Sequence, residues 1–349
     1  MKVLKFGGSS VAKPERIEQI VRILKSYYAK GEKFTVVFSA FGGITDSLIA
    51  MSKAAADGKE KEYLELFQAF SQRHIDAVNQ LIDKNQQASI IRELIDNHHN
   101  LKSLLQGIYL VREASQRTMD YVLSFGERNS AFLITQVLLQ HGIDARYLDA
   151  RDLIKTDKSF GSAKVDFDLS YQKIKVFYQQ NPAIHIVTGF ISSAKGGLTT
   201  TLGRGGSDYT ASILAAGLDA DLIEIWTDVD GVLTADPRKV KKAFTIPTLT
   251  FAEAMEMSHF GAKVIYPPTL QPALHKNISL VIKNTFNPEH PGTFISSVGN
   301  EAPEIIKGIS SIAEISLLTL QGSGMFGVPG IAGRLFGTLA QAGINIFLI

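Results

Sequence analysis

The sequence contains no cysteine and almost no excess of charge of either sign, and both absences exclude whole classes of protein. Without cysteine, the 349-residue chain has no disulfide framework, no thiolate metal site and no cysteine nucleophile. Its 36 basic and 34 acidic residues leave a formal charge of +2, too small for backbone-driven nucleic-acid binding. The composition fits a cytoplasmic protein, and we expect no secretory signal because Lys5 interrupts the first apolar run.

The last part of the chain is also poor in charge, and this raises the question of a membrane segment. Arg334 is the only charged residue from Ile315 to Ile349. Several glycines and Pro329 nevertheless interrupt this stretch, so it lacks the ~20 uninterrupted apolar residues of a transmembrane helix. The pattern instead predicts a buried strand, a glycine loop, a helix and a second strand. We therefore expect no membrane partner.

Short apolar, β-branched runs alternate with helical patterns, which is typical of a mostly parallel sheet flanked by helices in an α/β protein. Residues 14–29 predict a helix, with proline in the first turn and apolar residues at helical spacing. A polar, helix-rich stretch over 62–105 looks like an insertion beside the sheet, and another long helix is expected over 115–141. The expected strands are residues 3–6, 34–39, 145–148, 184–188, 222–226 and 278–283.

Two glycine-rich turns are candidate ligand sites. The first predicted strand runs into Gly7 and Gly8, where free backbone amides suit phosphate oxygens and Lys5 adds a positive charge, although an ordinary tight turn has the same sequence. In the second, Arg204 stands between glycines ahead of a predicted helix, which would let it present its guanidinium to a carboxylate or phosphate. Ser207 or Asp208 in this loop is alternatively an N-cap.

A third candidate lies directly after the predicted strand 222–226, in residues 226–231 and 236–238. Ligands of open α/β sheets bind at the carboxyl ends of strands, where these residues would lie.

These motifs, taken in order, resemble those of aspartate kinases, which have the amino-acid kinase fold. The similarity covers about residues 1–300, and the tail from about Lys307 resembles the start of the ACT regulatory region, particularly that of bifunctional aspartokinase–homoserine dehydrogenases. We expect a catalytic domain at 1–300 and a partial ACT-like region at 305–349. The matching segments are Lys5-Phe6-Gly7-Gly8-Ser9-Ser10-Val11, the loop 200–208, Ile225-Trp226-Thr227-Asp228-Val229-Asp230-Gly231, Asp236-Pro237-Arg238 and Phe260-Gly261-Ala262-Lys263-Val264.

The resemblance implies a role for each matching residue. Lys5 and Asp208 would be catalytic, with Asp208 organising the centre and its lysine. Glu127 would meet the ammonium group of the substrate and Arg204 its α-carboxylate. The remaining substrate-binding residues would be Ser39, Thr45 and Ser207, and the nucleotide would be held by Gly7, Gly8, Ser9, Thr227, Asp228, Arg238 and Lys263.

The implied reaction transfers the γ-phosphate of ATP to the β-carboxylate of L-aspartate, with Mg²⁺ as cofactor. The product, 4-phospho-L-aspartate, begins the pathway to lysine, threonine and methionine. A β-carboxylate, with a reference pKa of about 3.9, is ionised at neutral pH and needs no general base. We therefore expect Asp208 to orient the reacting groups rather than to take a proton. The histidines show no metal-ligand spacing, so no protein ligand of a metal is assigned.

Alternatives remain at this point. Another member of the same fold would phosphorylate glutamate, acetylglutamate, carbamate or a nucleoside monophosphate, and a regulatory subunit would bind an amino acid without activity. The glycine run 322–327 fits a dinucleotide fingerprint, but the strands and acidic residue that should follow are missing. It fits better as a loop that, in a complete ACT region, would help to bind an inhibitor such as threonine or lysine. ACT regions usually pair, so we expect a homodimer or a higher homo-oligomer.

The sequence departs from the family pattern at two positions. Ser9 replaces the usual threonine, which keeps the hydroxyl group, and Leu233 stands where many relatives have a tyrosine beside the nucleotide.

Overall fold

The computed structural model of the chain describes residues 1–259, 266–298, 306–312, 315–322, 328–344, 346 and 348–349. Its larger sheet is formed by β1 (Lys2–Phe6), β2 (Phe34–Phe38), β3 (Ala145–Leu148), β5 (Ile184–Thr188), β8 (Leu222–Thr227), β9 (Thr248–Thr250), β10 (Ser279–Asn284) and β11 (Thr293–Ser296). The strand order is β3-β5-β2-β1-β8-β10-β11-β9. Every neighbouring pair is parallel except β10 and β11. This confirms the predicted mostly parallel sheet.

A second, smaller sheet, in the order β4-β6-β7, lies at the carboxyl edge of the first and was not predicted. Its strands are β4 (Lys155–Thr156), β6 (Ile191–Ala194) and β7 (Leu198–Thr201). Serine and threonine dominate β6 and β7, so they lack the apolar run by which the other strands were found. The hairpin of β6 and β7 leads directly into the Arg204 loop.

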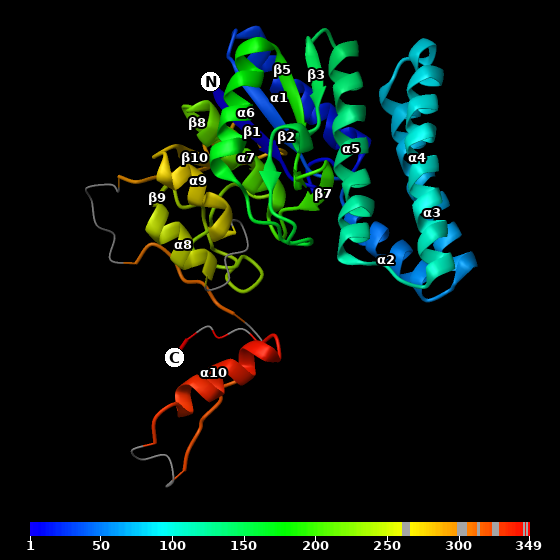
Figure 1. Cartoon of the computed structure of the whole chain (residues 1–349). Coiled ribbons are helices and arrows are strands. Elements are labelled where there is room, and N and C mark those ends of the chain that lie inside the picture. The colour runs from blue at the N-terminus through cyan, green and yellow to red at the C-terminus, as the bar shows by residue number, and fades with distance from the viewer. Residues whose placement is uncertain (260–265, 299–305, 313–314, 323–327, 345, 347) are drawn as a thin grey trace.

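Helices cover both faces of the larger sheet (Figure 1). Leu4 and Phe6 of β1 face a core shared with α1 and α5, whereas Val3 faces a core shared with α6, α7 and α9. The strands are apolar at almost every position because both faces of a parallel sheet are buried. The helices are α1 (Pro14–Ala29), α2 (Ile44–Ala56), α3 (Glu60–Leu81), α4 (Lys84–Val111), α5 (Gln116–Gln140), α6 (Phe167–Gln180), α7 (Gly206–Leu218), α8 (Phe251–His259), α9 (Gln271–His275) and α10 (Ile331–Gln341), with 3₁₀ turns at Ala150–Asp152 and Pro267–Leu270.

The predicted insertion over 62–105 is the hairpin of α3 and α4, which stands beside α5 and away from the sheet (Figure 1). Helix α1 has the predicted bounds, and the six expected strands all lie in the larger sheet. Within the described ranges, no helix is both long and apolar enough to cross a membrane.

The tail differs from its prediction. Helix α10 confirms the expected helix, but residues 315–322 form neither a strand nor a buried segment, and Leu317 is 94% exposed. A strand needs a neighbour to pair its backbone groups, and neither sheet of the described structure includes this segment. The expected second strand is likewise absent from the described residues near the end of the chain, and most of the glycine loop 322–327 lies outside them. Figure 1 shows α10 apart from both sheets.

Candidate active site

An ion pair between Lys5 and Asp208 lies at the carboxyl edge of the larger sheet. Side chains alternate along β1, so Lys5 shares the face of Val3, against which α7 packs. Asp208 is in the first turn of α7, where the helix dipole favours a negative charge. The Lys5 Nζ lies 2.6 Å from the Asp208 Oδ1, and the side chains are only 11% and 16% exposed. The structure thus brings together the two residues expected to be catalytic.

The glycine turn after β1 is held by its neighbours on the sheet. The Gly7 amide donates to the Trp226 carbonyl at 3.2 Å, so this amide already has a partner. A side chain on Gly8 would lie 3.2 Å from the Ala40 carbonyl, and glycine therefore permits the close approach of two loops. Arg16 Nη1 donates to the Ser9 carbonyl at 2.5 Å. These contacts hold the turn against the sheet, and Gly8 lines a cavity beside it.

This cavity, of about 730 Å³, lies between the turn, the loop after β2, α5 and the Arg204 loop. It contains all five expected substrate-binding residues and the Lys5–Asp208 pair. The members that the sequence predicted are Lys5, Gly8, Ser39, Thr45, Glu127, Arg204, Ser207 and Asp208.

Glu127, on α5, is a buried carboxylate at this cavity that is only 4% exposed. Its Oε1 accepts a hydrogen bond from the Ala40 amide at 3.2 Å, whereas its Oε2 has no partner. Burial raises the pKa of Glu127 to about 8. A cationic group entering the cavity would give the free oxygen a partner and favour the charged carboxylate.

The Arg204 loop owes its shape to glycine. Gly203 and Gly205 have φ values of +74° and +68°, which other residues adopt only with strain. The Arg204 side chain is exposed at the cavity, with no partner on the described chain drawing it away. Gly205 is the N-cap of α7, so the alternative in which Ser207 or Asp208 caps the helix is wrong. The glycines instead leave Arg204 free at the cavity mouth.

Sequence reasoning missed several residues that shape this cavity. Asp120 is buried in its wall and accepts hydrogen bonds from the Gly161 amide at 2.9 Å and from the Thr201 hydroxyl at 2.8 Å. Burial raises the pKa of Asp120, although these hydrogen bonds act against the shift. Asp120 thereby ties α5 to the strand that leads into the Arg204 loop. No sequence motif marks it, because its partners are distant in the chain.

Helix α3 supports the loop after β2 from behind. The ring of Phe41 stacks on His74 with centroids 5.3 Å apart, and Arg73 Nη2 donates to the Ala12 carbonyl at 2.9 Å. Burial lowers the pKa of His74 to about 4 and that of its neighbour His98 to about 3, so both are neutral near pH 7. The inserted hairpin is therefore part of the scaffold of the site.

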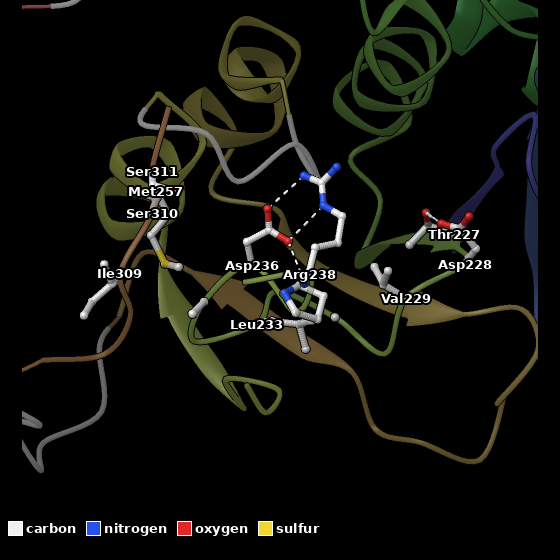
Figure 2. A pocket seen from close by; sticks show the side chains of 13 residues that line it. Thr227, Asp228, Val229, Leu233, Asp236, Arg238, Met257, Ile309, Ser310 and Ser311 are labelled. Atoms are coloured by element: carbon white, nitrogen blue, oxygen red, sulfur yellow. Dashed lines mark hydrogen bonds and ion pairs between the residues drawn. The ribbon is translucent and has the colours of Figure 1, made fainter. Parts of the chain in front are cut away.

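A second cavity, of about 340 Å³, lies beyond the carboxyl end of β8 (Figure 2). Of the residues expected at the nucleotide, it holds Thr227, Asp228 and Arg238, whereas Lys263 lies outside the described residues. The Arg238 guanidinium is paired with Asp236 at 2.8 Å, which lowers the pKa of Asp236 to about 2 and raises that of Arg238. Gly7 and Ser9 do not line either cavity.

The two cavities lie at the ends of neighbouring strands, the first at β1 and the second at β8. These strands are parallel with Phe6 opposite Trp226, so the glycine turn and the Thr227–Asp228 segment leave the sheet side by side. Among the described residues, no group of three or more histidine, aspartate or glutamate side chains is arranged to hold a metal ion.

Two protein-family models match the sequence of this chain. The model of the "Amino acid kinase family" matches residues 1–284, and an "ACT domain" model matches residues 318–349. The chain belongs to the amino acid kinase family.

Within this family the chain is similar to aspartokinases. Its structure resembles Escherichia coli aspartokinase III in complex with aspartate and ADP, with a TM-score of 0.82 and 32% identity, covering 100% of this chain and 76% of that one. The lysine and aspartate complex of the same enzyme gives a TM-score of 0.84 at 31% identity, with the same coverage of both chains. These likenesses confirm the predicted amino acid kinase fold and show that the chain is a member of the aspartokinases.

The curated relatives are longer than this chain. Bifunctional aspartokinase/homoserine dehydrogenase 2 of Arabidopsis thaliana is 36% identical, over 99% of this chain and 38% of its own length. Aspartokinase 1 of the same plant is 34% identical, over 99% of this chain and 61% of its own length. The chain therefore spans well under half of the bifunctional relative.

Proposed function

We propose that this aspartokinase-family chain transfers the γ-phosphate of ATP to the β-carboxylate of L-aspartate. The observation that carries the proposal is Glu127, a buried carboxylate with an unpartnered oxygen at the cavity that also holds Arg204 and the Lys5–Asp208 pair. The product would be 4-phospho-L-aspartate, the first intermediate toward lysine, threonine and methionine.

Opposite charges at the cavity support an amino acid as the acceptor. The Glu127 carboxylate would receive the substrate ammonium group, and Arg204 would pair with its α-carboxylate as a two-pronged donor. Ser39, Thr45 and Ser207 would complete the site from the loop after β2, from α2 and from α7 respectively. The β-carboxylate would then point toward the Lys5–Asp208 pair.

The chemical step requires two anions to approach each other. The attacking carboxylate is already ionised, so the site has to supply positive charge and alignment rather than a base. Lys5 would neutralise charge on the transferring phosphoryl group, and Asp208 would hold the Lys5 ammonium in place. The free amide of Gly8 is a candidate donor to a phosphate oxygen.

The nucleotide would occupy the second cavity. Thr227, Asp228, Arg238 and Lys263 are its proposed contacts, with phosphates toward the glycine turn because the two strand ends lie side by side. Mg²⁺ in phosphoryl-transfer sites takes one or two carboxylates together with substrate phosphates, and the Asp208 carboxylate fits that limited role. Bound there, the ion would neutralise phosphate charge.

Further features of the proposal concern the whole protein. The boundary between a catalytic unit at 1–300 and an ACT-like unit at 305–349, the homo-oligomer and the cytoplasmic location all remain predictions. The names of the Arabidopsis relatives describe them as chloroplastic.

An acceptor panel tests the proposed reaction. ADP release would be followed with L-aspartate, L-glutamate, N-acetyl-L-glutamate, carbamate and UMP, and we expect it with aspartate alone. Asp208→Asn should lose most of the turnover, by about 100-fold or more, with only a modest change in aspartate affinity. Asp219→Asn, at the exposed opposite end of α7, is the matched control and should keep its activity.

Two results would contradict the proposal. Absence of aspartate-dependent ADP release would refute the activity, and calorimetric binding of an amino acid without binding of ATP would favour a regulatory subunit. Unchanged turnover in Asp208→Asn would remove Asp208 from the mechanism.

A further inference from the structure

We propose that Ile309, Ser310 and Ser311, which lie between the kinase unit and α10, form the wall of the nucleotide cavity that receives the base. The inference rests on the proposed function only in taking this cavity as a nucleotide site. No sequence motif indicates these residues, and they lie beyond the 1–284 match to the kinase family.

The segment 307–311 is fixed to the kinase unit at three successive points. Lys307 Nζ lies 2.9 Å from the Glu253 Oε1 on α8, and the Ile309 amide donates to the Thr234 carbonyl at 2.8 Å. Lys239 Nζ donates to the Ser311 hydroxyl at 2.9 Å. The segment is therefore bound at its start to α8 and at the two following points to the loop that carries Asp236 and Arg238.

Gly308 allows the close contact between these attachment points. A Cβ at this position would lie 2.8 Å from the Met257 Cε and 3.2 Å from the Thr234 carbonyl oxygen. A side chain here would have to displace the end of the Met257 side chain and would be crowded against the Thr234 carbonyl of the loop. The fit of the segment against the kinase unit is thus built into the sequence.

The cavity itself has two chemically different ends, as Figure 2 shows. Thr227 and Asp228 stand at one end, next to the glycine turn that is proposed to hold phosphate. Ile309, Met257 and the two serines stand at the other, and the remaining lining includes Leu233, Ala235 and Pro237. A nucleotide with its phosphates at the polar end places its base among the apolar side chains.

Ile309 is the residue of this wall whose apolar surface a bound ligand would bury most. It is 67% exposed although it lines a cavity, so a flat ring placed against it would remove apolar surface from water. The Ser310 and Ser311 hydroxyls lie at the same end and offer polar contacts to ring nitrogens or amino groups.

Calorimetric titration of the full chain with ADP tests the inference. Ile309→Ala should weaken ADP binding roughly five- to tenfold, and Ser311→Ala, which releases Lys239, by about two- to threefold. Ile315→Ala removes a similarly exposed isoleucine outside the cavity and should bind ADP like the unaltered chain. Aspartate affinity should be the same in all four proteins.

Amide hydrogen exchange on the unaltered chain is a second readout. ADP should slow exchange in a peptide covering 306–312 and leave a peptide from α10 unchanged. Unchanged ADP affinity in Ile309→Ala together with unprotected 306–312 would overturn the inference and leave the proposed function standing. ADP binding with the expected losses but no phosphorylation of aspartate would refute the proposed reaction and support the inference, whereas no ADP binding by the unaltered chain would overturn both.

Discussion

Glu127 combines burial, an incomplete set of partners and a raised pKa, and this combination makes its charge depend on the occupant of the cavity. With a pKa of about 8, most of the Glu127 side chains carry a proton at pH 7 in the free protein. An ammonium group beside the carboxylate would lower that pKa and release the proton. Substrate binding and proton release are then two parts of one event.

We therefore predict that binding of L-aspartate near pH 7 releases close to one proton for each chain. The measurement is calorimetric titration in two buffers with different ionisation enthalpies, where the difference in apparent heat gives the number of protons. Glu127→Gln should bind aspartate more weakly and release none. Equal heats in both buffers for the unaltered chain would refute the assignment of Glu127 to the ammonium group.

The same carboxyl group makes the stability of the fold depend on pH. Its pKa is raised on folding from 4.5 to about 8, so above 4.5 the folded state holds a proton that the unfolded state has lost, and the free energy of unfolding falls as pH rises. His74 and His98 act oppositely, because their lowered pKa values of about 4 and about 3 make stability fall as pH drops below 6.5. Between pH 6.5 and 8 the Glu127 effect is the largest among these three groups, because each histidine contributes only about 0.4 kcal/mol there, in the opposite direction.

In that window we predict that Glu127 lowers the free energy of unfolding of the ligand-free chain by roughly 1.5 kcal/mol, measured as the difference between the unaltered chain and Glu127→Gln. Urea denaturation at pH 6.5, 7.2 and 8.0 measures it. Glu127→Gln should lack this fall and become slightly more stable over the same range, as the two histidines lose their charge in the unfolded state, so the comparison isolates the Glu127 contribution. A parallel slope in both proteins would contradict the raised pKa.

The residues of the site were predictable to different degrees. Arg204 could be found because a loop so rich in glycine costs backbone entropy unless a close approach is needed, whereas the Gly7–Gly8 turn beside Lys5 was a weak signal on its own; the structure places Lys5, Gly8 and Arg204 at the cavity. Glu127 was found only through the resemblance, since a single glutamate in a helix carries no signal of its own. Asp120 could not be found, because its role depends on partners 41 and 81 residues away.

At the scale of elements, α5 determines the position of the loop that carries Ser39 and leads into α2, where Thr45 lies. A Cβ on Gly126 would lie 2.8 Å from the Ala40 Cβ and 3.5 Å from Ile44, so the helix and the loop touch through the missing side chain. Ala40 is also the residue whose amide contacts Glu127. A displacement of this loop would therefore disturb both sides of the proposed amino-acid site.

Gly126→Ala should raise the KM for aspartate about tenfold or more and destabilise the fold by about 1–3 kcal/mol, because the loop has to move to admit one methyl group. Steady-state kinetics and thermal unfolding provide the two measurements. Gly107→Ala is the matched control on α4, where nothing lies within 4 Å of the added carbon. It should stabilise the chain by up to about 1 kcal/mol and leave KM unchanged.

The helices and strands were predictable where their apolar residues form a continuous run or recur at helical spacing. Six strands of the larger sheet read as short apolar runs and α1 as a stripe at helical spacing, so their positions were correct to within a residue or two, whereas the short strands β9 and β11 carry no such run and were missed. The polar hairpin of β6 and β7 was missed because its threonines pair across strands and with Asp120 rather than pack as an apolar core. The tail was misjudged for the opposite reason, since an apolar run does not make a strand without a neighbour to pair with.

On the scale of the whole molecule, exposed apolar side chains gather on the tail from Ile315 onward, of which the ACT domain model matches residues 318–349. Leu317 is 94% exposed, Leu320 50% and Leu348 82%, and α10 has no buried residue. Apolar surface that a protein leaves uncovered usually marks a contact with another molecule. The tail is therefore the surface through which we expect copies of this chain to associate.

Sedimentation velocity at several concentrations should show association that increases with concentration. Leu317→Asp should weaken it, because a carboxylate is costly to bury in an apolar contact. Val298→Asp introduces the same charge at a position that is 79% exposed on the kinase unit and should leave association unchanged. Equal behaviour of both variants would show that the tail does not mediate the contact.

The only tryptophan of the sequence is Trp226, at the end of β8. Its ring is buried against Phe6, its carbonyl accepts a hydrogen bond from the Gly7 amide, and the next residue lines the second cavity. All indole fluorescence of the chain therefore originates between the strand ends that border the two cavities. The intrinsic fluorescence of this single tryptophan should therefore change when a substrate binds, so that binding can be followed without an attached label.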